Sequence, residues 1–263
     1  MIFVFSGTGN TLWAARQLAE ATGEQLFSMA DELQGTCRYQ LHDGERIGFC
    51  FPVHGWQPPH LVRQFIEKMQ LSCPESVEAH YCYALCTCGD STGLTMTMLS
   101  KALRHHGLRL HSAFSLIMPE SYVCLPFMYT DTQEREREKI AKAQEQLNSY
   151  MTMIADRRQG EEHLDKGATP WTFSHVIGAY FNAHMISDKK FCVDADLCIH
   201  CGRCQKVCPT HNISMAEGLP TWSHDGKSCT CCLACYHHCP QHAINYGKIT
   251  RKRGQYYFGK NKQ

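Results

Sequence analysis

CIHCGRCQKVCP at residues 198–209 and CTCCLACYHHCP at residues 229–240 decide how the C-terminal part of this chain folds. Both stretches have the spacing Cys-x2-Cys-x2-Cys-x3-Cys-Pro. Three closely spaced cysteines let one turn of backbone surround an iron–sulfur cluster, and the fourth cysteine of such a run ligates the other cluster of a two-cluster protein. The spacing therefore predicts two ligand sets, which exchange their fourth members: Cys198, Cys201, Cys204 and Cys239 in one, and Cys229, Cys232, Cys235 and Cys208 in the other.

The repeat extends beyond the cysteines. At an offset of 31 residues the two halves share further matches: Asp194 with Asp225, Pro209 with Pro240, His211 with His242, and Ile213 with Ile244. A pair of zinc sites is the alternative, because Cys-x2-Cys pairs also bind zinc. Zinc accounts for four of the cysteines and leaves the other four and both Cys-Pro pairs without a role. The chain resembles the two-cluster bacterial ferredoxins over about residues 188–247, which implies an α+β domain with two [4Fe–4S] clusters.

The composition of the whole chain limits its class. With 263 residues it forms one large domain or two modest ones. Nine of its 17 cysteines lie outside the two runs without a secretory disulfide spacing, which favours a reducing, cytoplasmic location. The net charge is +1, and no nucleic-acid-binding signature occurs, so we expect no nucleic-acid partner. No segment has the length and apolar character of a membrane span.

The N-terminus combines a short apolar run, Ile2–Phe5, with the loop Ser6–Thr11 and a helical pattern after it. A strand, a glycine-containing loop and a helix together form a phosphate-binding site, because the backbone amides of the loop and the start of the helix point toward the bound phosphate. A Walker loop requires Gly-Lys-Ser/Thr, which is absent, and a dinucleotide fingerprint requires a glycine where Leu12 stands. The pattern Ser/Thr-x-Thr-Gly-x-Thr resembles the flavodoxin loop for flavin mononucleotide (FMN). An ordinary strand-to-helix turn remains the alternative.

Strands and helices alternate through the rest of the N-terminal part. The predicted strands are 2–5, 25–29, 46–51, 80–87 and 109–118, and the predicted helices follow Pro58 and cover 94–105 and 132–158. This alternation predicts a parallel sheet that is covered on both faces. The resemblance to flavodoxins implies a doubly wound α/β sheet of order 2-1-3-4-5, with the ligand at the carboxyl ends of the strands.

Three loops and one further segment meet at that edge in the expected fold. The expected FMN-binding residues are Ser6, Gly7, Thr8, Gly9, Asn10 and Thr11 for the phosphate, and Pro52, Val53, His54, Gly55, Trp56, Thr87, Cys88, Gly89, Asp90 and Tyr122 for the ring. Cys88 stands where an aromatic residue is expected, which predicts a ring that is more open or covered by another segment. Met118–Tyr122 is similar to a Met-Pro-x-Asn-Tyr segment, with Ser121 in place of Asn. With the phosphate loop and both cysteine runs, it makes the chain resemble fused flavodoxin–ferredoxin proteins of anaerobic microbes.

The predicted organisation has four parts. Residues 1–158 form an FMN-binding domain, 159–187 a polar linker and an aromatic brace between the domains, 188–247 the two-cluster domain, and 248–263 a basic tail. The brace covers Trp171–Ile186, and a helix lying on a membrane is a weaker interpretation of it. The tail is expected to be solvated or loosely docked.

Two one-electron clusters and a flavin in one chain predict an electron-transfer protein that relays single electrons between donor and acceptor proteins. This function needs no acid–base catalyst. The alternatives are a flavin-dependent reductase of a small substrate, with His54 or Cys88 as proton donor, and a redox sensor. A sensor needs no second cofactor, so the phosphate loop argues against it.

Overall fold

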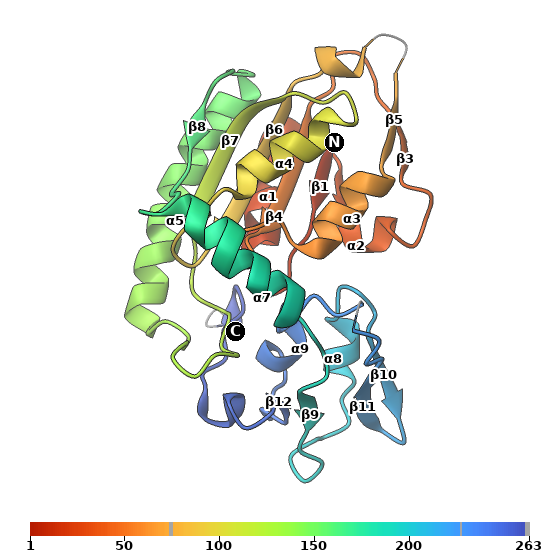
Figure 1. Ribbon diagram of the computed structural model, residues 1–263, viewed down its shortest axis with the longest axis vertical. Helices are drawn as coiled ribbons and strands as arrows, with labels where there is room; N and C mark the ends of the chain where they lie inside the picture. Colours follow the sequence, from red (N-terminus) through yellow and green to blue (C-terminus); the bar gives the residue numbers. More distant parts are fainter. Residues whose placement is uncertain (74–75, 227, 261–263) are drawn as a thin grey trace.

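The computed structural model describes residues 1–73, 76–226 and 228–260. A large α/β part contains the N-terminal half of the chain, and a smaller part built from the cysteine runs packs against one end of its sheet (Figure 1). The carboxyl ends of the central strands face the smaller part. This arrangement brings the predicted phosphate loop and the predicted cluster ligands to the same region.

The large part is organised around a six-stranded sheet of order β2-β1-β4-β6-β7-β8, in which every neighbouring pair is parallel. Its strands are β1 (Ile2–Val4), β2 (Leu26–Ser28), β4 (Ile47–Pro52), β6 (Cys82–Cys88), β7 (Leu110–Ile117) and β8 (Glu162–His163). The first five overlap the strands predicted from the apolar runs. A mostly parallel sheet with covering helices therefore agrees with the predicted α/β class.

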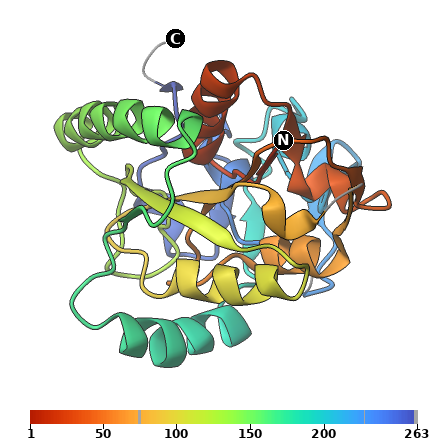
Figure 2. The same cartoon turned by 90° about the horizontal axis from the view of Figure 1, so that it is seen from above.

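Helices cover both faces of this sheet (Figure 2). They are α1 (Asn10–Thr22) and α5 (Gln133–Ala155) on one face, and α2 (Met29–Glu32), α3 (His60–Lys68) and α4 (Thr95–Arg104) on the other. Successive strand residues point to opposite faces, so Leu85 packs with α1 and α5 whereas Ala84 and Cys86 pack with α3 and α4. Burial on both faces explains why the strands read as continuous apolar runs.

Two elements of the large part escape the sequence prediction. The stretch 161–170 was expected as a linker, but Glu162 and His163 form β8 and extend the sheet beside β7. A second small parallel sheet joins β3 (Arg38–Gln40) to β5 (Gln70–Ser72). The strands β8, β3 and β5 are each only two or three residues long, which is too short for a period-2 pattern to be visible in the sequence. A 3₁₀ turn at Val77–Ala79 follows β5.

The small part preserves the sequence repeat in its backbone. Its elements are β9 (Phe191–Val193), α8 (Arg203–Lys206), β10 (Ile213–Ala216), β11 (Leu219–Trp222), α9 (Ala234–His237) and β12 (Ile244–Tyr246), with a 3₁₀ turn at Thr250–Lys252 after them. Both α8 and α9, and likewise β10 and β12, start 31 residues apart. The strands pair antiparallel as β9 with β12 and β10 with β11, so each pair joins the two halves. Neither half is a separate folding unit.

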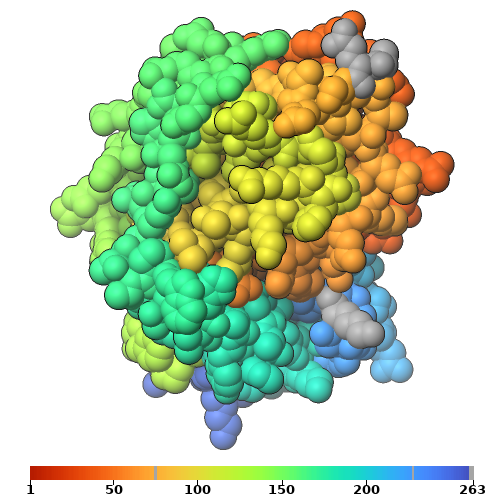
Figure 3. Space-filling view, turned by 45° about the horizontal axis from the view of Figure 1, so that its top comes forward, coloured from red at the N-terminus to blue at the C-terminus, as the bar shows by residue number. Residues whose placement is uncertain are grey.

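A helical segment joins the two parts and corresponds to the predicted brace. It comprises α6 (Pro170–Thr172), a π-helical turn (Phe173–Ile177) and α7 (Gly178–His184). In the space-filling view the green-to-teal chain runs along one side of the large part and continues toward the small part, which is blue (Figure 3). Within the described ranges, no helix has the length and apolar character needed to cross a membrane.

Candidate cofactor site

A cavity of about 560 Å³ lies where the sheet edge meets the cysteine runs. All the residues predicted to bind FMN line it except Gly9: Ser6, Gly7, Thr8, Asn10, Thr11, Pro52, Val53, His54, Gly55, Trp56, Thr87, Cys88, Gly89, Asp90 and Tyr122. The volume lies in the range of small-molecule and cofactor sites. The structure therefore gathers segments that are more than a hundred residues apart in the chain around one cavity.

The loop Ser6–Thr11 presents unused hydrogen-bond donors to this cavity. The backbone N–H groups of Gly7, Thr8 and Gly9 have no acceptor among the described residues. Gly9 takes the N-cap position of α1 with φ 94°, a left-handed conformation that glycine adopts without steric cost. Free amides at the start of a 13-residue helix fit an anionic phosphate. The Thr11 hydroxyl bonds to the Thr87 hydroxyl at 2.8 Å, which ties the loop to the end of β6.

A tight turn at 54–57 forms the second wall. The backbone groups of His54 and Gln57 bond reciprocally, at 3.1 and 3.2 Å, and the two residues between them, Gly55 and Trp56, both have φ 54°. Two positive φ values at the centre of a two-residue turn are typical of type I′ geometry. A tryptophan rarely adopts this conformation, so its surroundings must hold it there.

The brace holds this turn. The Ser174 hydroxyl donates to the Trp56 carbonyl at 3.0 Å, and the Asn182 amide donates to the His54 carbonyl at 3.1 Å. A Cβ atom on Gly178 would lie 2.2 Å from the Gly55 carbonyl oxygen, so the helix backbone rests directly on the turn. The brace therefore packs directly against the turn at 54–57.

Burial keeps the two side chains considered as proton donors in their neutral forms. Burial lowers the pKa of His54 to about 3, so its imidazole is neutral at physiological pH. Burial also raises the pKa of the Cys88 thiol well above its usual value. Both residues line the cavity, as predicted, but as neutral wall groups.

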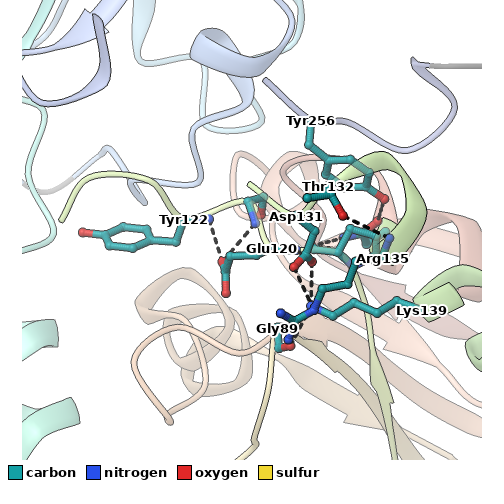
Figure 4. A network of polar contacts seen from close by, with 11 residues as sticks. Gly89, Glu120, Tyr122, Asp131, Thr132, Arg135, Lys139 and Tyr256 are labelled. Carbon is teal, nitrogen blue, oxygen red and sulfur yellow. Dashed lines mark hydrogen bonds and ion pairs between the residues drawn. The ribbon is translucent and has the colours of Figure 1, made fainter. Parts of the chain in front are cut away.

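Glu120 is a cavity residue that the sequence analysis did not select. Its Oε1 accepts hydrogen bonds from the backbone N–H groups of Ser121 at 2.9 Å and Tyr122 at 2.8 Å (Figure 4). Behind it, the Lys139 ammonium donates to Asp131 Oδ2 at 2.6 Å and to the Gly89 carbonyl at 3.1 Å. Burial raises the pKa of Glu120 despite these partners. This network fixes the loop after β7 against the loop after β6.

The first predicted ligand set surrounds one small cavity in the cysteine part. Cys198, Cys201, Cys204 and Cys239 all line it, so the fourth cysteine of the second run lies with three cysteines of the first. The loop backbones repeat as well: residues in the left-handed region occur at His200 and Gly202 in the first run, and 31 residues later at Cys231 and Leu233 in the second. The same turn is therefore built twice.

The second predicted set lies together on the side facing the sheet. Burial, followed by the neighbouring thiols of Cys232, Cys229 and Cys208, raises the pKa of Cys235 well above its usual value. A buried thiolate requires a compensating positive charge, which iron supplies when bound. Among the described residues, no group of three or more His, Cys, Asp or Glu side chains is arranged to hold a single metal ion.

The cysteine part and the phosphate loop are in direct contact. A Cβ atom on Gly7 would lie 2.7 Å from Cys232 Cβ and 3.2 Å from its Sγ. On the other side of the cavity, His237 Nε2 lies 2.6 Å from the Ser121 carbonyl oxygen, and its Nδ1 accepts the Tyr256 N–H at 3.0 Å. Burial lowers the pKa of His237 to about 3, so its neutral ring can donate with one nitrogen and accept with the other.

The C-terminal tail, for which a solvated or loosely docked end was expected, is also part of this contact. The buried Tyr256 hydroxyl donates to Asn10 Oδ1 at 2.6 Å, and the Phe258 N–H donates to the Thr8 carbonyl at 2.8 Å. The ring of Phe258 stacks on Trp13 with centroids 5.0 Å apart. Through Tyr256 and Phe258, the tail therefore packs against the loop Ser6–Thr11 and the start of α1.

The Tyr256→Phe variant should lower the thermal midpoint. Removal of the hydroxyl leaves Asn10 Oδ1 without its buried donor, which costs about 1–3 kcal/mol. Tyr257→Phe is the matched control, because the Tyr257 ring stacks on His238 and its hydroxyl has no hydrogen-bond partner in the described part of the chain. Thermal melts of both variants make the comparison. Equal melting of the two would show that the tail contact contributes nothing.

The cavity and tail residues that the sequence analysis did not select belong to no motif, except that Glu120 occupies the variable position of the segment Met118–Tyr122. Glu120, the brace residues Phe173, Ile177, Tyr180 and Phe181, and the tail residue Tyr256 reach the site through contacts that are distant in sequence. The aromatic content of 171–186 and the three aromatic residues of the tail were the available signals, and neither specifies a partner surface.

Comparison with known proteins places the cysteine runs in a family. Residues 197–244 match the 4Fe-4S dicluster domain. A comparison with curated proteins gives no match. The match covers the C-terminal part, which is therefore a ferredoxin domain of the iron–sulfur electron-transfer type.

Proposed function

We propose that this chain is an electron-transfer protein in which two [4Fe–4S] clusters and FMN form an internal relay. The observation that carries the proposal is the shared cavity, whose walls are the predicted phosphate loop on one side and Thr230–Leu233 of the second cysteine run on the other. The contact between Gly7 and Cys232 supports close approach of the two cofactors. When bound, the clusters carry single electrons and FMN accepts one or two.

The proposed ligand sets are those of the two runs with exchanged fourth cysteines. One set is Cys198, Cys201, Cys204 and Cys239, and the other is Cys229, Cys232, Cys235 and Cys208. The free amides of Gly7 and Thr8, with the hydroxyl of Thr8, hold the phosphate of FMN in this proposal. The loops after β4 and β6 hold its ring. These residues bind and orient the cofactors, and none acts as an acid or base.

The exposure of the ligands suggests an order of transfer. Cys201 is exposed and Cys198 half-buried, and the apolar side chains of Leu197 and Ile199 beside them are exposed as well. By contrast, Cys232 of the second set lines the proposed flavin cavity. In our proposal, redox partner proteins exchange electrons with the cluster of Cys198 and Cys201, and the other cluster connects it to FMN.

Cofactor analysis of anaerobically prepared protein tests this function. We expect about eight iron and about eight sulfide ions per chain, as two [4Fe–4S] clusters require, with one FMN released on denaturation. Zinc without sulfide would refute the cluster assignment. Full clusters without flavin would refute the relay and leave a ferredoxin domain attached to an α/β domain of other function.

A phosphate-loop variant tests the flavin site separately. Thr8→Val with Thr11→Val removes hydroxyl donors that are worth about 1.5–3 kcal/mol each to a charged group, so the FMN dissociation constant should rise at least about tenfold. Most of this loss should come from Thr8, because the Thr11 hydroxyl already bonds to Thr87. Thr22→Val at the other end of α1 is the control. Fluorescence titration with FMN measures the affinities, and unchanged binding in the double variant would reduce the loop to an ordinary turn.

A second function, reduction of a small substrate, is favoured by one observation. The cavity continues past the predicted flavin loops to the brace and to the loop 125–128. A protein that only transfers electrons needs no such extension.

A further inference from the structure

The cavity has a polar end and an apolar end. The polar end is the phosphate loop. The apolar end is built from side chains of the brace and of the loop after β7: Leu125, Phe127, Met128, Phe173, Ile177, Tyr180, Phe181 and Met185. We refer to these eight residues as the apolar collar. None of them belongs to a loop that the sequence analysis assigned to FMN.

Several collar residues are poorly protected from water. Phe127 is 75% exposed, Tyr180 63% and Ile177 43%, although all three line the cavity. Contiguous exposed apolar side chains at the mouth of a cavity mark a binding surface, because single soluble chains rarely leave such patches uncovered. The network of Glu120, Asp131 and Lys139 holds the first residues of the loop after β7, which also carries Phe127, in place (Figure 4).

The charges of the cavity restrict what binds there. Among the described residues that line it, none is lysine or arginine, whereas Asp90 and Glu120 are carboxylic acids. An anionic ligand at the collar would find no lysine or arginine among the described lining residues, and two acidic side chains in the same cavity. Aromatic walls favour a flat ring, through stacked and edge-to-face contacts such as that between Tyr122 and Phe181, whose centroids are 5.2 Å apart.

We propose that the apolar collar binds a neutral, planar aromatic molecule next to the flavin. The inference rests on the proposed FMN site and extends it by naming a second ligand of defined chemistry. The polar end of the cavity holds the cofactor, and the apolar end receives the ring.

Equilibrium dialysis of the full, FMN-loaded chain tests the inference with two probes, 2-naphthol and naphthalene-2-sulfonate. Both contain the same flat ring system and differ in charge, and neither is an electron acceptor under these conditions. We expect 2-naphthol to bind at one site and the sulfonate to bind at least about tenfold more weakly, because the collar is apolar and no described lysine or arginine lines the cavity.

Two matched variants locate the site. Phe127→Ser with Tyr180→Ser removes two collar rings, and the 2-naphthol dissociation constant should rise about tenfold. Trp171→Ser with Val176→Ser removes two exposed apolar side chains of the brace that do not line the cavity, and affinity should be unchanged. All four side chains are more than half exposed, so both variants should fold.

Each other result overturns the inference. These results are absence of 2-naphthol binding, equal binding of the sulfonate, or equal losses in the two variants. Co-sedimentation with phosphatidylcholine vesicles that is weakened equally in both variants would instead make the exposed side chains a membrane-lying face. FMN content is measured on every sample, so that a chain without flavin refutes the proposed function and a chain with flavin but without ring binding refutes only the collar site.

Discussion

Replacement of Cys208 by alanine is expected to remove the cluster of the opposite cysteine run. The iron and sulfide contents should fall from about eight to about four per chain. The physical reason is that Cys208 stands in the first run but lies beside the half-buried Cys232 and the buried Cys235 of the second, whose pKa values it helps to raise. Without its fourth thiolate, that cluster would lack a protein ligand at one iron and should be lost.

The control for this variant is Cys192→Ala. Cys192 is an exposed thiol of the same domain that lies outside both runs, and its loss should leave both clusters in place. Electron paramagnetic resonance of the reduced protein distinguishes the clusters, because interaction between two neighbouring paramagnetic centres disappears when one is lost. If Cys208→Ala instead impaired the cluster of Cys198, Cys201 and Cys204, the exchanged ligand sets would be wrong.

Replacement of Gly7 by alanine should separate the two cofactor regions. The backbone at Gly7 lies outside the left-handed region, so alanine can adopt its conformation, and the effect of the substitution comes from steric contact of the added Cβ. Its Cβ would lie 2.7 Å from Cys232 Cβ and 3.1 Å from the Cys232 carbonyl oxygen, which forces the cysteine loop away from the phosphate loop. Overpacking of this kind costs about 1–3 kcal/mol. Electron transfer between the cluster and FMN should slow about tenfold or more, because the rate falls steeply with separation.

Gly35→Ala provides the comparison for Gly7→Ala. The nearest atom to a Cβ at Gly35 is the Glu32 carbonyl oxygen at 3.5 Å, an ordinary contact, so this variant should behave like the parent protein. Iron, sulfide and flavin contents are determined for both variants, and transfer is followed by the flavin and cluster absorbances. A Gly7→Ala protein with full cofactor content, parent stability and an unchanged transfer rate would exclude direct contact as the basis of the relay.

The sequence is most informative where chemistry fixes the spacing of residues. Cluster ligation requires the interval between Cys198 and Cys204, so the cysteine runs identify their domain without a structure. The strands of the sheet can also be recognised in the sequence, because strands such as 82–88 are buried on both faces and therefore appear as apolar runs. The strand β8 is invisible because two residues give no period.

The surroundings of the cofactor site could not be predicted from local patterns. Tyr256 reaches Asn10 across 246 positions, and Ser174 reaches Trp56 across 118. Such contacts depend on how complete elements pack, which no short motif encodes. Glu120 was overlooked for a different reason: it occupies the variable position of the segment Met118–Tyr122, and its burial beside Gly89 in the loop after β6 is visible only in the structure.

Rapid anaerobic mixing with a one-electron reductant is the measurement that tests the relay most directly. The account predicts that the clusters are reduced first and FMN second, at a rate that does not depend on protein concentration, because transfer occurs within one chain. Loss of the second cluster in Cys208→Ala should slow the flavin step greatly. Flavin reduction that is equally fast without that cluster, or that accelerates with protein concentration, would contradict the internal relay and show that the two parts work separately.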